Sequence, residues 1–325
     1  MHNIIDEARS HIGNMLWVRA LKKHKTKMGR ILAPAYTDYL IKAQNSYSEH
    51  PNLPSELHGC ADEFLEKGFT SFRTEETGKL AQEIMRIIAA EEEKKGDALW
   101  NDMARYTGGE IFSKFPQIES IFAKTIGPVM NAIFKAHYKI FYGLMYKSVR
   151  TIDERAYSQI WHSDGGPGTC INVMLTLVDT DPENGAFESL PWHESVDIFS
   201  RERAALRAVG TLPHDHRSDN RREDLNYFRN NYYEKEVTEK YSNRTTQFTG
   251  QAGTIIAFRN NILHRGGFVK PGRTRHAIVF HVYPSVKEVP LEEYRTKGIA
   301  KVTGIPSSPD FDDENISLHK TDSKQ

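Results

Sequence analysis

A histidine and an aspartate are separated by a single residue in the stretch YSQIWHSDGGPG, residues 157–168. In a strand, residues i and i+2 point to the same face, so His162 and Asp164 are expected to reach one common point. An imidazole and a carboxylate together suit a divalent metal, particularly iron, zinc or manganese. The glycines after Asp164 let the chain turn away from such a site without steric cost. The stretch therefore predicts two metal ligands, and a third must come from elsewhere.

The best candidate for the third ligand is His264, in GTIIAFRNNILHRGG. This histidine follows an expected strand and turn and precedes two glycines. Arg275 begins the next expected strand, and a guanidinium there could hold a carboxylate of a small dicarboxylic acid through two parallel bonds. A structural salt bridge is the alternative role for Arg275. Arg273 competes for the same role if the strand register is shifted.

Weaker candidates are polar residues near these motifs. Asn172 and Thr176 share one face of INVMLTLVD, and polar side chains inside a strand need partners. They are expected to contact a cosubstrate or to line the pocket, with exposure at a sheet edge as the alternative. Gln159, Lys147 and His193 are the candidates for contact with a substrate.

Other histidines have a simpler interpretation. His214, Asp215 and His216 form a second metal-like cluster, but no strand pattern surrounds it, so a solvated loop is expected. His276 and His281 lie on the last expected strand, where at most one should face a cavity. For each of them, a hydrogen-bonded core histidine is the plain alternative.

Composition limits the broad class. The 325 residues suffice for one large domain with an extension, and Lys plus Arg equals Asp plus Glu at 43 each. The charge balance therefore gives no indication of nucleic acid or an anionic membrane as a partner. Two cysteines cannot build a disulfide scaffold or a four-cysteine zinc site. Without a run of 18 apolar residues or a secretory signal at the start, we expect no membrane span and a cytoplasmic location.

Helical patterns precede strand patterns along the chain. Residues 2–48 are expected to be helical, residues 50–59 form a Pro-rich linker, a helix ends near Gly68, a strand covers 69–73, a helix begins near Thr74, and 117–138 are helical before a further strand. After residue 155, INVMLTLVD, GTIIAF and RHAIVFHVY are rich in β-branched and aromatic residues, as strands are. This order favours an α+β or mainly β protein, with helices packed on a β core.

Three regions follow from this division. Residues 1–58 would form a helical extension with its linker, residues 59–290 the main domain, and residues 291–325 a tail whose end is disordered. Residues 197–248 are highly charged and too long for an ordinary loop. We expect this insertion to be partly helical or mobile and to cover the mouth of the site.

The order His162-Ser163-Asp164, His264, Arg275 resembles that of iron(II)- and 2-oxoglutarate-dependent dioxygenases, and within them the phytanoyl-CoA dioxygenase family. Three segments carry the resemblance further: FLEKGFTSFRTEE, LVDTDPENGAFESLPWHES with its Asn184-Gly185 turn, and FRNNILHRGG. The chain departs from the family pattern at residues 191–193, where Pro-Trp-His replaces the usual Pro-Gly-Ser-His.

The resemblance implies a double-stranded β-helix, a jelly-roll and cupin-like core with packed helices. It also implies that His162, Asp164 and His264 hold Fe(II), that Arg275 holds the far carboxylate of 2-oxoglutarate, and that O2 is the oxidant. The reaction would hydroxylate or otherwise oxidise a small molecule and release succinate and CO2. Related halogenases replace the carboxylate ligand by a small residue, so Asp164 argues against halogenation.

Two other functions fit the same residues. One is a zinc- or manganese-dependent hydrolase or isomerase on the same barrel, which would not need Arg275. The other is a binding protein that kept the fold and lost the chemistry, which would be expected to have a damaged ligand set. The identity of the substrate and the oligomeric state do not follow from the sequence.

Overall fold

A computed structural model describes residues 34–49, 53–96, 104–149, 157–164, 170–198 and 233–297. Several expectations concern residues outside these ranges. They are the amino-terminal helix before residue 34, the cluster at 214–216, most of the charged insertion, and the end of the tail.

Helices dominate the first half of the described chain. They are α2 (Pro34–Asn45), η1 (Ser55–Leu57), α3 (Cys60–Lys67), α4 (Glu75–Lys95), α5 (Gly109–Lys114), α6 (Gln117–Ile121), the π-helical segment η3 (Phe122–Ile126) and α7 (Gly127–Phe134). Later helical segments are η4 (Tyr157–Gln159), residues 192–198, α10 (Glu234–Lys240), η6 (Ser242–Arg244) and α11 (Leu291–Lys297).

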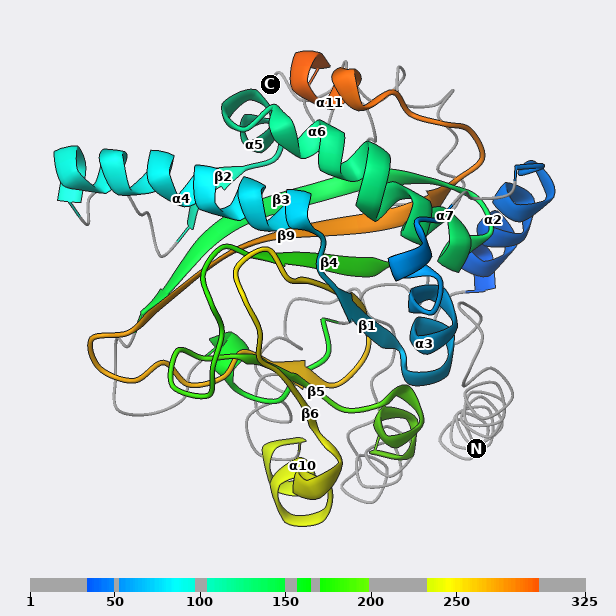
Figure 1. The fold of residues 1–325 in the computed structure, drawn as a ribbon. Coiled ribbons are helices and arrows are strands. Elements are labelled where there is room, and N and C mark those ends of the chain that lie inside the picture. The colour runs from blue at the N-terminus through cyan, green and yellow to red at the C-terminus, as the bar shows by residue number, and fades with distance from the viewer. Residues whose placement is uncertain are drawn as a thin grey trace, which may run out of the picture.

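The larger sheet has six strands, and each pair of neighbours is antiparallel. Its order is β1 (Phe69–Phe72), β7 (Ile255–Arg259), β4 (Ile171–Thr176), β9 (Thr274–Ser285), β3 (His137–Val149) and β2 (Ala104–Thr107). Helices α4, α6 and α7 cover one face of this sheet, and the smaller sheet lies on the other side (Figure 1).

The smaller sheet has the order β6 (Thr246–Phe248), β5 (Phe187–Ser189) and β8 (His264–Arg265), again antiparallel. Strand β6 lies within the stretch expected to be an insertion. The carboxyl end of the charged region thus contains helix α10 and strand β6. Strand β6 joins the sheet with Phe248 packed against Phe187 of β5. Residues 199–232 lie outside the described ranges.

Two apolar clusters occupy the two faces of the six-stranded sheet. The cluster on the helical side includes Phe64 of α3, Ile84 of α4 and Phe280 of β9. The cluster on the other side includes Met174 of β4 and Phe187 of β5, so it fills the space between the sheets. Alternate residues of β4 and β9 serve the two clusters, as the period of a strand requires.

The local sequence signals place α3, β1 and α4 as expected. Gly68 ends α3 with a left-handed φ of 81°, which glycine adopts without penalty. Thr74 caps α4, and its side chain and that of Thr77 exchange hydrogen bonds with each other's backbone N–H. The expected helix at 117–138 ends at Phe134, and β3 starts at His137.

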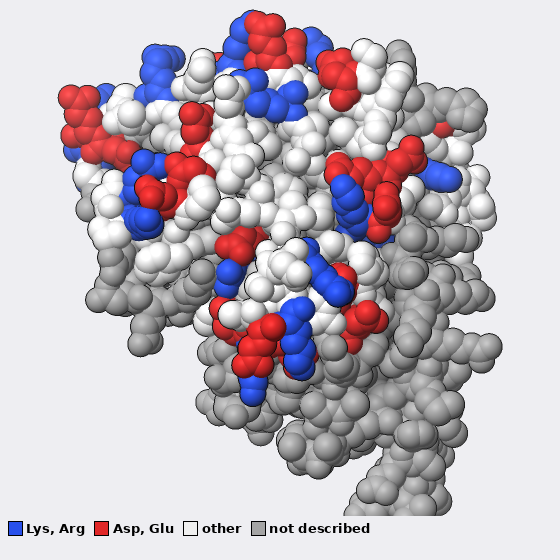
Figure 2. Space-filling model, turned by 60° about the horizontal axis from the view of Figure 1, so that its bottom comes forward, with Lys and Arg blue, Asp and Glu red and all other residues white. Residues whose placement is uncertain are grey.

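The surface carries both signs of charge. On the face drawn in Figure 2, acidic and basic side chains of the described residues are interspersed rather than gathered into one large patch of a single sign. None of the helices in the described ranges has both the length and the apolar character that crossing a membrane requires.

Candidate metal centre

His162 and His264 are joined through their backbones. The N–H of His162 donates to the carbonyl of His264 at 3.0 Å, and the N–H of His264 donates to the carbonyl of His162 at 2.9 Å. This is an isolated antiparallel bridge, not the regular strand expected for residues 162–164. The bridge brings two histidines that are far apart in the sequence to directly opposed positions.

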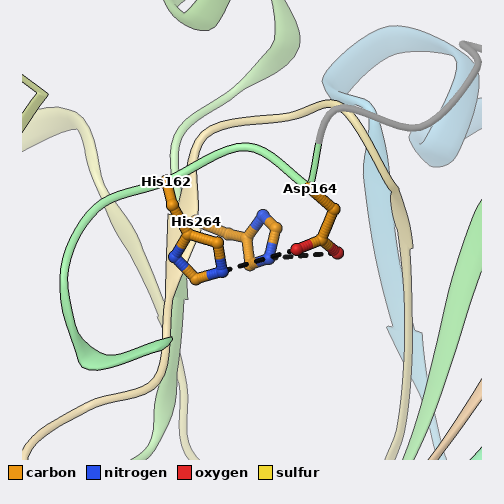
Figure 3. Close-up of side chains that lie close together, drawn as sticks. All are labelled: His162, Asp164 and His264. Carbon is orange, nitrogen blue, oxygen red and sulfur yellow. Dashed lines mark ion pairs between the residues drawn. The ribbon is translucent and has the colours of Figure 1, made fainter. Parts of the chain in front are cut away.

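The three expected ligand side chains converge (Figure 3). Nε2 of His162 lies 3.5 Å from Oδ1 of Asp164, and Nε2 of His264 lies 3.7 Å from Oδ2. The donor atoms of all three residues lie within 4.8 Å of one another. Adjacent ligands of an octahedral ion at about 2.1 Å would be about 3 Å apart, so small side-chain movements would complete such a site.

Each imidazole is held by its own chain. Nδ1 of His162 lies 2.6 Å from the carbonyl oxygen of Ile160, and Nδ1 of His264 lies 2.9 Å from that of Ile262. A carbonyl only accepts, so each Nδ1 carries a proton, and once Nε2 is deprotonated its lone pair faces Asp164. This is the tautomer and orientation in which a histidine binds a metal through Nε2.

Two asparagines orient the carboxylate. Nδ2 of Asn172 donates to Oδ2 of Asp164 at 2.8 Å, and Nδ2 of Asn260 donates to the same oxygen at 3.3 Å. Asn260 Nδ2 also lies 3.1 Å from Oδ1 of Asn172, and its carbonyl accepts from the N–H of Asp164. Asn172, expected to contact a cosubstrate or line the pocket, holds a ligand candidate. The sequence does not predict a role for Asn260, because nothing in NNILH indicates that the first asparagine faces Asp164.

The electrostatics keep Asp164 ionised. Burial acts to raise the pKa of Asp164, but the charge of His264, the hydrogen bond and charge of His162, and the hydrogen bond from Asn172 outweigh it. The pKa therefore lies well below the ordinary value for aspartate. With 30% of its side chain exposed, the carboxylate stands at the open side of the two more deeply buried rings.

Arg275 is buried beside the segment that carries His264. It is 4% exposed, and its guanidinium donates to the carbonyl of Gly185 and, at 3.4 Å, to Oγ of Ser148. Its Nη2 would be 2.9 Å from a Cβ placed on Gly266, two residues beyond His264. The described residues offer it no carboxylate and leave its Nε without a partner. Arg273, the competitor, is exposed and pairs with Asp181.

The other expected site residues are placed differently. Thr176 donates its hydroxyl to the carbonyl of Thr254, so it does not join the asparagine network. Lys147, expected near a substrate, binds Glu92 of α4 at 2.7 Å on the helical side of the sheet. Ser148 and Tyr146, not Lys147, share the face of Arg275, so Lys147 lies on the other face of the sheet from the candidate ligands.

Histidines and Gln159 complete this comparison. His193 is exposed and lies beside Glu194, and Gln159 is half-buried in η4. His276 contacts Glu92 on the helical side, whereas His281 pairs in register with Asn172. Burial lowers the pKa of His281, and the charge of Asp164 acts in the opposite direction. At most one of the two histidines of β9 thus faces the candidate site, as expected.

A charged network behind the histidines also escaped the sequence analysis. Arg265 follows His264 and donates to Glu188 at 2.9 Å and to Glu234 at 3.0 Å. Glu234 of α10 in turn accepts from the backbone N–H of Trp161 at 3.2 Å. The network links the two segments that carry the histidines to α10, and only the tertiary structure brings its acids together.

Comparison with known proteins gives limited similarity. No protein-family model matches the chain. A curated relative, ectoine dioxygenase from Nocardia farcinica, is 26% identical over 138 residues, which is 42% of this chain. The predicted resemblance to a dioxygenase is confirmed. The aligned part spans only 43% of the length of that relative.

The solved structures to which this chain is similar include SnoK and EctD. The non-heme alpha ketoglutarate dependent carbocyclase SnoK from nogalamycin biosynthesis has a TM-score of 0.47 at 12% identity, covering 73% of this chain and 87% of SnoK. EctD from S. alaskensis with 2-oxoglutarate and 5-hydroxyectoine has a TM-score of 0.46 at 15% identity, covering 79% of this chain and 83% of EctD.

Proposed function

We propose that this chain is an iron(II)- and 2-oxoglutarate-dependent oxygenase that oxidises a small metabolite. The observation that carries the proposal is the convergence of His162, Asp164 and His264 close to a buried arginine that lacks an acidic partner among the described residues. A metal hydrolase would need the first feature and has no use for the second.

The residues fit the metal. Two imidazole nitrogens and one carboxylate, all approaching from one side, form the ligand set typical of non-haem Fe(II) oxygenases and leave positions open for other ligands. When bound, Fe(II) would supply the activation of O2 that is coupled to oxidative decarboxylation of 2-oxoglutarate. His162 and His264 would bind it through Nε2, and Asp164 through one carboxylate oxygen.

The chain's own residues would bind and orient. The carbonyls of Ile160 and Ile262 hold the two rings, and Asn172 with Asn260 holds Asp164, so little rearrangement is needed on binding. Arg275 would bind the distal carboxylate of 2-oxoglutarate with charge-assisted bonds in a buried position. The apolar cluster between the sheets would keep water from the reacting groups.

The two antiparallel sheets and the placement of the site between them support a double-stranded β-helix core. In this proposal residues 59–290 form the oxygenase domain, residues 1–58 an extension, and residues 291–325 a tail. The charged region around 197–248, with α10 attached to the histidine segments, would cover the site.

The test is succinate release from 2-oxoglutarate. The full chain with Fe(II), 2-oxoglutarate, O2 and a panel of small metabolites should release succinate, and at least one metabolite should stimulate the release. His264→Ala should abolish it, whereas His58→Ala, at an exposed histidine just before α3, should leave it unchanged. Metal-dependent hydrolysis without 2-oxoglutarate turnover would identify the chain as a hydrolase instead.

A further inference from the structure

Arg259, the last residue of β7, is buried against Trp192. Its side chain is 0% exposed, and its Cζ lies 4.5 Å from the centre of the Trp192 ring. Its Cδ would lie 3.4 Å from a Cβ placed on Gly68, which fixes the side chain between α3 and the helical segment 192–198.

Among the described residues, the guanidinium of Arg259 has no hydrogen-bond partner. Throughout the described ranges, no acceptor reaches Nε, Nη1 or Nη2 of Arg259. The indole Nε1 of Trp192, also fully buried, is equally unsatisfied. Buried polar atoms are nearly always paired, and three on one guanidinium are exceptional. The two side chains in contact thus present buried donors and no acceptor.

Arg265 provides the contrast within the same molecule. It lies over Trp161 with its Cζ 4.7 Å from the ring centre, much as Arg259 lies over Trp192. Its nitrogens, however, bind the carboxylates of Glu188 and Glu234. Stacking on a tryptophan is therefore common to both arginines, and the missing acid distinguishes Arg259.

Arg259 is nevertheless a cation. Burial lowers its pKa to about 9, and no acidic group in the described part of the chain offsets this effect. At neutral pH the side chain remains protonated, so a full positive charge sits in an apolar environment. A buried charge of this kind is normally paired with an opposite charge.

We propose that Arg259 and the Nε1–H of Trp192 bind a compact monovalent anion, a halide or a formate-sized carboxylate. One guanidinium and one neutral donor compensate a single negative charge, and complete burial excludes a large ligand. The anion would stabilise the turn Arg259–Ile262, closed by a 3.1 Å backbone bond, from which Asn260 reaches Asp164. The site is independent of the reaction proposed above.

Thermal unfolding of the full chain tests the site. The protein is measured at constant ionic strength while sodium gluconate, whose anion is too large, is replaced by chloride in one series and by formate in another. Chloride or formate should raise Tm by about 5 °C at a concentration 100-fold above the dissociation constant. A response to chloride alone would identify a halide site, and a response to formate a carboxylate site.

Matched variants locate the effect. Arg259→Met should abolish the response and should be no less stable than the wild type in gluconate, since it removes an unpaired charge. Arg265→Met should lose stability in gluconate because it leaves two glutamates unpaired, and should keep the response. Arg275→Met should also keep it, which excludes binding at the proposed cosubstrate arginine.

Three results would overturn the proposal. They are a wild-type Tm that does not change with either anion, a response that survives in Arg259→Met, and a strong loss of stability in Arg259→Met in gluconate, which would reveal an acid of this chain as the partner. If Arg259→Met does not fold, Arg259→Lys should bind the anion at least tenfold more weakly, and unchanged binding would equally refute the site.

Discussion

Arg275 is the residue at which an oxygenase and a metal hydrolase with the same three ligands would differ. We predict that Arg275→Ala weakens 2-oxoglutarate binding by roughly 30-fold to several thousandfold, since loss of one partner of a buried charged pair costs about 2–5 kcal/mol. Arg275→Lys should lose less, because it keeps the charge and loses the fork. Titration of the Fe(II)-loaded protein with 2-oxoglutarate measures the effect.

The control for this prediction is Arg273→Ala. Arg273 is exposed and paired with Asp181, so its removal should change 2-oxoglutarate affinity little. Metal affinity should persist in Arg275→Ala, which has no ligand removed. Unchanged succinate formation in Arg275→Ala would contradict the assigned cosubstrate site.

In the proposed metal site, Asn172 would act on the metal through its hydrogen bond to Asp164. We predict that Asn172→Ala weakens divalent metal binding by about 10–100-fold, the usual effect of losing a hydrogen bond that orients a ligand. Thr176→Val is the matched control on the same strand, because the Thr176 hydroxyl binds the carbonyl of Thr254 instead. Calorimetric titration with Co²⁺ compares the two, and equal losses would show that Asn172 serves only the fold.

Among the helices, α4 contributes to the stability of the fold without contacting the candidate ligands. Thr74→Ala removes one half of the reciprocal cap with Thr77 and should lower the free energy of unfolding by about 1 kcal/mol. Arg86→Ala, on the exposed surface of the same helix, should change it by less than about 0.5 kcal/mol. Urea unfolding measures both, and metal affinity should be unchanged because α4 covers the opposite face of the sheet (Figure 1).

For the whole molecule, the buried His276 should contribute acid sensitivity from the helical side of the sheet. Burial lowers the pKa of His276 from 6.5 to about 4, although Glu92 favours its protonated form. The unfolded chain binds a proton first as pH falls, so this contribution to stability is complete above pH 6.5 and is lost between pH 6.5 and 4. At pH 5 the loss should be about 2 kcal/mol relative to pH 7.

The measurement is urea unfolding at pH 7 and pH 5. His276→Gln should show a smaller decrease than the wild type, whereas His193→Gln, at an exposed position, should behave like the wild type. An identical decrease in His276→Gln would mean that other groups cause the acid sensitivity.

Features that depend on near neighbours could be predicted from the amino-acid sequence alone. Gly68 ends α3 and Thr74 starts α4 because a left-handed residue and a side-chain cap act within one helical turn. The sequence also predicts the metal-binding residue types His162, Asp164 and His264 and their order before Arg275. They form a short motif followed by residues at the ends of strands.

Which candidate side chains come into contact depends on how the strands pair and pack. Strand residues alternate between faces, so the pairing of Ser148 with Arg275 alone determines that Lys147 turns toward α4 and away from the site. Asn260 reaches Asp164 across a separation of 96 residues, and no local pattern contains that contact. Arg265 likewise binds Glu188 and Glu234, which are distant from it in the sequence. They lie close to it because the smaller sheet and α10 pack together. Partnership between distant residues depends on strand register and packing, which the whole chain determines jointly.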